Sequence, residues 1–140
     1  MRALGIDFGE RRIGIALSSG SVASPLETVQ RSGDHSTDHQ RILGIAGEWE
    51  VDTLVVGLPL SLDGSEGPAA QFVRSEIEEL VAATSLPVVP YDERLTTVTA
   101  TRLLQEGEVS GRSQRQMVDQ VAAAVMLQAW LDSRVAQTDS

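Results

Sequence analysis

Alternating large apolar and small or polar residues dominate the first thirty positions of the chain. In residues 3–9 every second residue is Leu, Ile or Phe, and the positions between them hold Ala, Gly and Asp. This is the period of a strand whose two faces differ. Residues 9–11 are typical of a turn, residues 13–18 repeat the alternation, and residues 25–29 predict a third strand. Short turns between consecutive strands favour an antiparallel meander.

Beyond residue 35 the pattern changes to helices that alternate with apolar strands. Ser36 or Thr37 could cap the first helix, because small hydroxyl side chains are favoured at that position. The continuous apolar run over residues 53–58 is typical of a strand buried on both faces of a sheet. The predicted segments are helices over residues 36–50 and 69–83 and strands over residues 53–58 and 86–91.

The last part of the chain predicts two more helices. We expect one to begin at Thr96 or Thr97 and the other to cover residues 117–131, with a polar loop over residues 107–113 between them. A meander followed by strand–helix–strand crossovers predicts an α/β fold, a mixed five-stranded sheet with helices on both faces.

Length and composition limit the possible functions. The 140 residues suit one domain, which we expect over residues 1–133 with a flexible C-terminal tail over 134–140. There is no cysteine, which excludes disulfides, thiolate nucleophiles and cysteine metal ligands. No signal-peptide pattern or apolar run of about 18 residues occurs, so we expect a soluble, cytoplasmic protein without a membrane partner. The net charge of −9 argues against broad, non-specific nucleic-acid affinity.

Three carboxylates occupy positions where the pattern expects apolar side chains. Asp7 lies within the first strand, Glu93 at the end of a later strand, and Asp119 on the last helix. Burying an unpaired charge is costly, and a bound cation is one way to retain it. If the helix packs over adjacent strands, the three acids converge, and their oxygen ligands suit Mg²⁺ or Mn²⁺. Gly5 and Gly9 share the face of Asp7 and would leave room for metal and substrate.

Each acid also has a simpler explanation. Asp7 could be satisfied by an arginine or by backbone amides, and Glu93 could form a surface ion pair with Arg94. Asp119 could be favoured in the first turn of a helix by the helix dipole. From the residues alone these alternatives stay open.

Two other polar groups have a structural and a functional interpretation. Asp63 could bond backbone amides in a tight turn, or Ser65 could bind phosphate at the start of the following helix. His35 and His39 are spaced i, i+4, as in some metal pairs. Without a surrounding HExxH pattern, we expect them at a solvated helix start.

Four motifs together resemble those of the YqgF family, a bacterial group described as pre-16S rRNA nucleases and as Holliday-junction-resolvase-like proteins. They are "GIDFGERRIGIA", "VVGLPLSLDGSEG", "YDERLTT" and "VDQVAAAVMLQAWL". They span residues 4–131 in the family's order. The chain departs from the family at residues 18–20, where many members carry an acid, and at Arg11, where lysine is common.

The resemblance implies a ribonuclease-H-like fold, with Asp7, Glu93 and Asp119 as an acidic triad that binds one or two Mg²⁺ or Mn²⁺ ions. Four further residues are implied to lie near the site: Arg11, Arg12, Arg94 and Thr96. We expect the arginines to meet phosphate oxygens, although Arg94 could instead orient Glu93, and Arg11 or Arg12 could cap a solvated hairpin.

The function that we predict is hydrolysis of phosphodiester bonds by a metal-dependent nuclease. The resemblance favours processing of the 5′ end of pre-16S rRNA, with possible ribosomal assembly partners, and leaves resolution of branched DNA as an alternative. A non-catalytic nucleic-acid-binding factor and an ATPase of related core are further alternatives, although no G-x-x-x-x-G-K-[ST] loop occurs. Monomer and homodimer both stay open.

Overall fold

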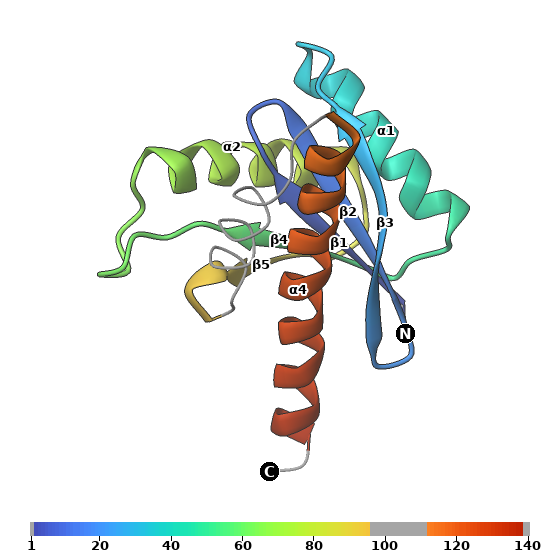
Figure 1. The fold of residues 1–140 in the computed structure, drawn as a ribbon, viewed down its shortest axis with the longest axis vertical. Helices are drawn as coiled ribbons and strands as arrows, with labels where there is room; N and C mark the ends of the chain where they lie inside the picture. Colours follow the sequence, from blue (N-terminus) through green and yellow to red (C-terminus); the bar gives the residue numbers. More distant parts are fainter. Residues whose placement is uncertain (1, 96–111, 139–140) are drawn as a thin grey trace.

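The computed structural model describes residues 2–95 and 112–138. Its five strands form one sheet in the order β3-β2-β1-β4-β5, with helices on both faces (Figure 1). The strands are β1 (Ala3–Phe8), β2 (Arg12–Ser19), β3 (Val22–Gln30), β4 (Thr53–Leu58) and β5 (Val88–Asp92). The helices are α1 (His35–Glu48), α2 (Pro68–Ala83), the 3₁₀ helix η1 (Glu93–Leu95) and α4 (Arg112–Thr138).

The central strand β1 joins the two halves of the sheet. It pairs antiparallel with β2, which pairs antiparallel with β3. On its other side β1 runs parallel to β4, and β4 runs parallel to β5. The predicted meander and parallel crossovers are therefore confirmed. Strand β3 is longer than the expected 25–29 because it pairs along the whole of β2, and Pro25 is tolerated because β3 is an edge strand.

The two faces of the sheet carry different helices. On one face Leu4, Ile6 and Phe8 pack in a core with α1 and α2, and on the other Ala3 packs under α4. The second face has small residues because α4 approaches closely. A Cβ added at Gly5 would lie 2.9 Å from the Cβ of Leu127. The space at Gly5 is thus occupied by the helix, and our expectation that it makes room for a metal is wrong.

The helix boundaries that differ most from the expected ones are the start of α1 and both ends of α4, which begins at Arg112 rather than at residue 117. Helix α1 is capped by Asp34, which accepts a hydrogen bond from the Thr37 amide at 3.1 Å, so neither Ser36 nor Thr37 is the cap. Helix α4 continues to Thr138, where we expected a tail from residue 134. The segment contains neither Gly nor Pro to stop a helix, and the Arg134 guanidinium lies 4.8 Å from the centre of the Trp130 ring, one turn away.

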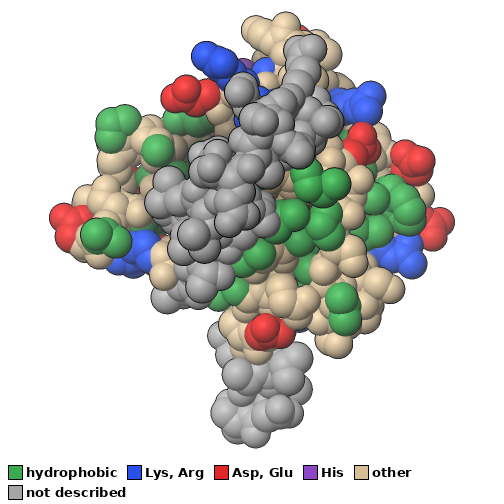
Figure 2. Space-filling model, viewed as in Figure 1, with side chains coloured by type: hydrophobic (Ala, Val, Ile, Leu, Met, Phe, Trp, Pro, Cys, Tyr) green, Lys and Arg blue, Asp and Glu red, His purple; other side chains and the backbone are tan. Residues whose placement is uncertain are grey.

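Some expectations lie outside the described residues. These are the helix from Thr96 or Thr97 and most of the loop over 107–113, of which residues 112 and 113 begin α4. In the parts that the structure describes, no helix is long and apolar enough to span a membrane. On the face that carries α4, the described acidic and arginine side chains are scattered around the rim and form no continuous basic patch (Figure 2).

Candidate active site

The centre of the candidate site is a row of three residues on adjacent strands. Asp7 in β1 is paired with Gly14 in β2. On the other side Ile6 is paired with Val56 of the parallel strand β4, so Gly57 follows beside Asp7. Paired positions in a sheet point to the same face. Asp7 is therefore a side chain with a glycine on each side, on the face that α4 covers.

The space above these two glycines is filled by the other two predicted acids. A Cβ at Gly57 would lie 2.5 Å from Oε1 of Glu93, and a Cβ at Gly14 would lie 2.6 Å from the carbonyl carbon of Asp119. Glu93 and Asp119 therefore come over the sheet on opposite sides of Asp7. The structure thus places Glu93 and Asp119 beside Asp7 on one face of the sheet; of the three acids, Asp7 and Glu93 line one cavity, and the Asp119 carboxylate pairs with Arg12. Their role as metal ligands stays a prediction.

A cavity of about 610 Å³ opens at this acidic cluster. Its walls come from the end of β1, the residues that follow β4, the first turns of α2, and Glu93. This is the carboxyl edge of the parallel strands, where α/β proteins commonly bind ligands. Asp7 and Glu93 both line the cavity and are only 6% and 8% exposed. Two carboxylates so shielded from water interact strongly with any cation in the cavity.

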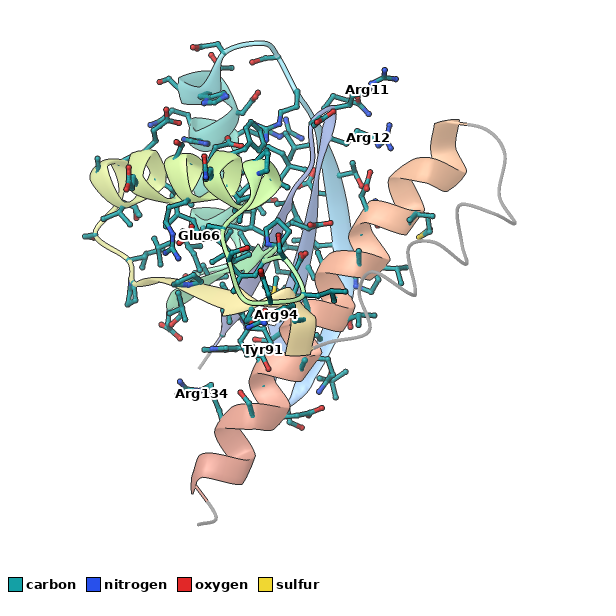
Figure 3. All side chains as sticks on the ribbon, turned by 90° about the vertical axis from the view of Figure 1, so that its left-hand side faces the viewer. Arg11, Arg12, Glu66, Tyr91, Arg94 and Arg134 are labelled. Carbon is teal, nitrogen blue, oxygen red and sulfur yellow. The ribbon has the colours of Figure 1, made fainter. Side chains whose placement is uncertain are left out.

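Arg12 holds Asp119 in place. Its Nε donates to Oδ2 of Asp119 at 2.6 Å, and the two side chains are 22% and 13% exposed. Arg12 and Arg11 both lie at the end of the β1–β2 hairpin, near the first turns of α4 (Figure 3). Arg11 is exposed and extends away from the body of the protein (Figure 3). Of this pair, Arg11 is the residue whose position suits contact with an approaching phosphate.

Arg94 binds Asp92 and the loop before α2. Its Nη2 donates to Oδ2 of Asp92 at 2.7 Å, and its Nη1 donates to the Leu62 carbonyl at 3.1 Å. The hydrogen bond from Arg94 holds the pKa of Asp92 below its ordinary value. Arg94 thus joins the end of β5 to the loop before α2. Thr96 lies outside the described residues.

Ser65 takes part in a tight turn. Its amide and hydroxyl both donate to Oδ1 of Asp63, at 2.9 and 2.7 Å, and these hydrogen bonds lower the pKa of Asp63. Gly64 between them has a φ of 90°, which favours glycine. The tight turn that we considered for Asp63 is therefore observed. Phosphate binding by Ser65 stays a prediction.

A buried ion-pair network lies behind the cavity and was not expected from the sequence. Arg31 donates from Nε and Nη2 to the Gly9 carbonyl at 3.0 and 2.9 Å, and both oxygens of Glu76 accept from its guanidinium. Nε2 of His39 lies 2.8 Å from Oε1 of Glu76. Glu76 is fully buried and His39 is 3% exposed, so the expected solvated position is wrong for His39. Arg31 thereby fixes the turn that follows Asp7.

The spacing of residues along α2 could have predicted this network. Glu76 falls three residues after Val73 and one before Ile77 on the inward face of α2, so a charged residue on that face predicts a buried partner. The ligand atoms of His35, Glu76 and Glu79 lie within 4.8 Å of one another. Because both oxygens of Glu76 already accept from Arg31, we interpret this group as part of the ion-pair network.

Comparison with known proteins gives consistent matches over nearly the whole chain. A family model described as "RuvX: Holliday junction resolvase" matches residues 1–133. A protein of Anaeromyxobacter sp. (strain Fw109-5) named "Putative pre-16S rRNA nuclease" is 49% identical, over 96% of this chain and 98% of its own. A protein of the same name from Thermoanaerobacter pseudethanolicus is 41% identical, over 96% and 98%.

The fold is similar to that of solved resolvase structures. RuvC of Thermus thermophilus in complex with a Holliday junction substrate matches with a TM-score of 0.61 at 18% identity, over 96% of each chain. A second structure of Thermus thermophilus RuvC matches with a TM-score of 0.57, over 97% of each chain. At this identity the likeness concerns the fold alone, and it confirms the expected ribonuclease-H-like architecture.

Proposed function

The chain belongs to the RuvX family, the group of the YqgF-like motifs, and from this premise we propose that it is a metal-dependent nuclease that processes the 5′ end of pre-16S rRNA. The observation that carries the proposal is the acidic cluster. Asp7 and Glu93 are buried in one cavity, and Asp119 lies on the opposite side of Asp7 from Glu93.

The residues present fit a hard divalent cation. The cluster offers carboxylate oxygens only, which are the ligands that Mg²⁺ and Mn²⁺ prefer. Asp7 and Glu93 are both shielded from water in this cavity, where carboxylates interact strongly with a bound cation. We infer that Asp7, Glu93 and Asp119 hold one or two ions. A bound Mg²⁺ or Mn²⁺ would supply charge stabilisation at the phosphoryl oxygens and a more acidic water.

The protein itself supplies rigid positions for these groups. Asp7 lies in the central strand, hydrogen-bonded on both sides to neighbouring strands. Glu93 packs against Gly57, and Asp119 is held by Arg12. None of the described histidines lines the cavity, so we assign proton abstraction to no histidine. Arg11, exposed at the hairpin end, is the candidate for phosphate contact.

The RNA substrate and the place of action follow from the relatives. Those cited above carry the name of a pre-16S rRNA nuclease, and we extend this activity to the chain, in the cytoplasm and beside ribosomal assembly partners. A net charge of −9 disfavours tight non-specific binding of RNA. We therefore expect the substrate to be recognised through the site and its surroundings rather than by a broad basic surface.

Resolution of branched DNA is the second candidate. It is favoured by the description of the matching family model and by the Holliday junction substrate of the RuvC structure. A resolvase cuts two strands symmetrically, which requires two sites related by a two-fold axis. This candidate therefore predicts a homodimer in solution, whereas trimming of one RNA end requires only a monomer.

The decisive experiment compares both substrates with one site variant. Purified protein is incubated with a 5′-extended 16S rRNA precursor and with a four-way DNA junction, in Mn²⁺, in Mg²⁺ and with a chelator. We expect metal-dependent RNA cleavage that Asp7→Asn reduces to background, because this change removes a ligand charge without changing side-chain size. Glu48→Gln, an exposed acid at the end of α1, is the matched control and should cleave at the wild-type rate.

The outcomes separate the alternatives. Cleavage of the junction alone, by a dimer, would replace RNA processing with resolution. RNA cleavage that persists in Asp7→Asn would remove the acidic cluster from the chemistry. If neither substrate is cut and Asp7→Asn binds RNA as tightly as wild type, the protein is a non-catalytic binding factor.

A further inference from the structure

The cavity at the acidic cluster is larger and more apolar than a phosphate and a cation require. Asp7, Glu10 and Glu93 form only part of the lining of its 610 Å³ or so. Phosphate and hydrated cations are polar throughout, so an apolar wall must face another chemical part of the substrate. Six apolar residues form this wall: Phe8, Pro59, Pro68, Ala69, Phe72 and Val73.

The ring of Phe72 is fixed in place on this wall. The Arg31 guanidinium lies 5.4 Å from the centre of the Phe72 ring and 5.5 Å from that of Phe8. The His35 ring meets Phe72 edge-on at 6.3 Å. Arg31 is itself held by Glu76 and the Gly9 carbonyl. A ring supported in this way loses little freedom when a flat ligand stacks on it.

The apolar wall and two of the acids line one cavity. Phe8 and Asp7 are neighbours in β1 and point to opposite faces of the sheet, but both line the cavity at the end of the strand, as does Gly57, against which Glu93 packs. A phosphate held at the acids would therefore bring a flanking nucleotide to the wall. Every nucleobase has a flat, apolar face, and stacking on an aromatic side chain contributes about 1–3 kcal/mol per base.

We propose that the apolar part of this cavity binds one unstacked nucleobase next to the scissile phosphate. The inference rests on the proposed function and narrows its substrate. A base in the cavity cannot also be stacked inside a duplex. The strand is therefore cut beside an unpaired nucleotide, in a single-stranded extension or at an unstacked position of a folded substrate.

The test removes the base and keeps the backbone. A short RNA with one cleavage site is prepared with a single abasic residue at each position around the cut. At one position next to the scissile phosphate, kcat/KM should fall by roughly 5- to 150-fold, the range set by the loss of one stacked base. At positions farther away it should stay at the wild-type value. Equal cleavage of the whole series would overturn the proposal.

Variants of Phe72 show whether the wall is responsible. Phe72→Ala should reduce cleavage of the intact RNA by a similar factor and cause no further loss on the abasic RNA, because the same contact is already absent. Phe72→Trp should retain cleavage, because it keeps an aromatic face on which a base can stack. Val81→Ala, a 52% exposed position near the other end of α2, is the control. Equal losses for Phe72→Ala on intact and abasic RNA would contradict base stacking.

A binding measurement separates this proposal from the proposed function. Asp7→Asn protein is mixed with RNA that carries 2-aminopurine at each position in turn, because this base brightens when it leaves its neighbours. A rise at one position next to the scissile phosphate supports the inference even without cleavage, and no rise at any position overturns it. Cleavage that depends on Asp7 but not on any single base would reject this inference and leave the nuclease function standing.

Discussion

Replacing Gly57 with alanine moves a predicted metal ligand without deleting it. The added Cβ would lie 2.5 Å from Oε1 of Glu93 and 3.1 Å from its Cδ. Ordinary van der Waals contact begins at 3.4 Å, so the carboxylate must shift by about 0.9 Å, the difference between 3.4 and 2.5 Å. Gly57 does not have a positive φ, so the backbone itself accepts alanine.

The shift should reduce catalysis far more than stability. Misplacing a reacting group by about 1 Å can cost on the order of 100-fold in rate, and we expect a loss of this size in single-turnover cleavage. The clashing atom is the end of a side chain, so the loss in free energy of unfolding should stay near the lower end of the roughly 1–3 kcal/mol typical of overpacking. Rate and urea denaturation are measured on the same preparation.

Gly44→Ala provides the matched control. A Cβ at Gly44, within α1, meets nothing within 4 Å, and alanine should stabilise the helix by up to about 1 kcal/mol. This variant should cleave at the wild-type rate. If Gly57→Ala also cleaves at the wild-type rate while remaining folded, the position of the Glu93 carboxylate does not matter for the reaction, and our reasoning on the site is refuted.

Two further predictions concern stability. Gly14→Ala should destabilise the protein by about 1–3 kcal/mol or more, since the added Cβ would meet the backbone of Asp119, which cannot rotate away. Urea denaturation measures this loss, and an unchanged denaturation midpoint would contradict the close approach of Asp119 to Gly14. Glu76→Gln should cost about 3–5 kcal/mol because Arg31 loses the buried carboxylate to which both of its terminal nitrogens donate. Burial raises the pKa of Glu76, but hydrogen bonds from Arg31 and His39 outweigh it and lower the pKa below 4.5. Because the pKa of Glu76 is lower in the folded protein, its ionised carboxylate contributes fully to the free energy of unfolding above about pH 4.5. This contribution is lost as the pH falls through the pKa of the folded protein. Wild type should therefore lose stability more steeply in acid than Glu76→Gln.

The order of elements and their two faces follow from the sequence. Alternation in residues 3–9 and helical spacing in 69–83 report which side of a local segment is apolar, and local periodicity is sufficient for that. The meander and the mixed sheet were predicted in this way, and the ribonuclease-H-like class was implied by the family resemblance. The three acids were found because charges in apolar patterns are costly, a consideration that needs no tertiary structure.

Contacts between distant segments depended on the tertiary structure. The sequence does not distinguish the roles of Gly5, Gly14 and Gly57. The packing of α4 shows that Gly5 accommodates Leu127 and that Gly14 accommodates Asp119. The position of η1 shows that Gly57 accommodates Glu93. A glycine indicates that something approaches closely but does not identify it, because the approaching group comes from another part of the chain.

The pairing of charges was also decided by the fold. The sequence left both Arg12 and Arg94 as candidates for phosphate, whereas the structure pairs Arg12 with Asp119 and Arg94 with Asp92. The sequence by itself determined which residues carry charge in an apolar pattern, because hydrophobic periodicity is local. Only the tertiary structure decided which charges meet and which face of the cavity is apolar, because strand order and helix packing bring together residues whose separation along the chain carries no such information.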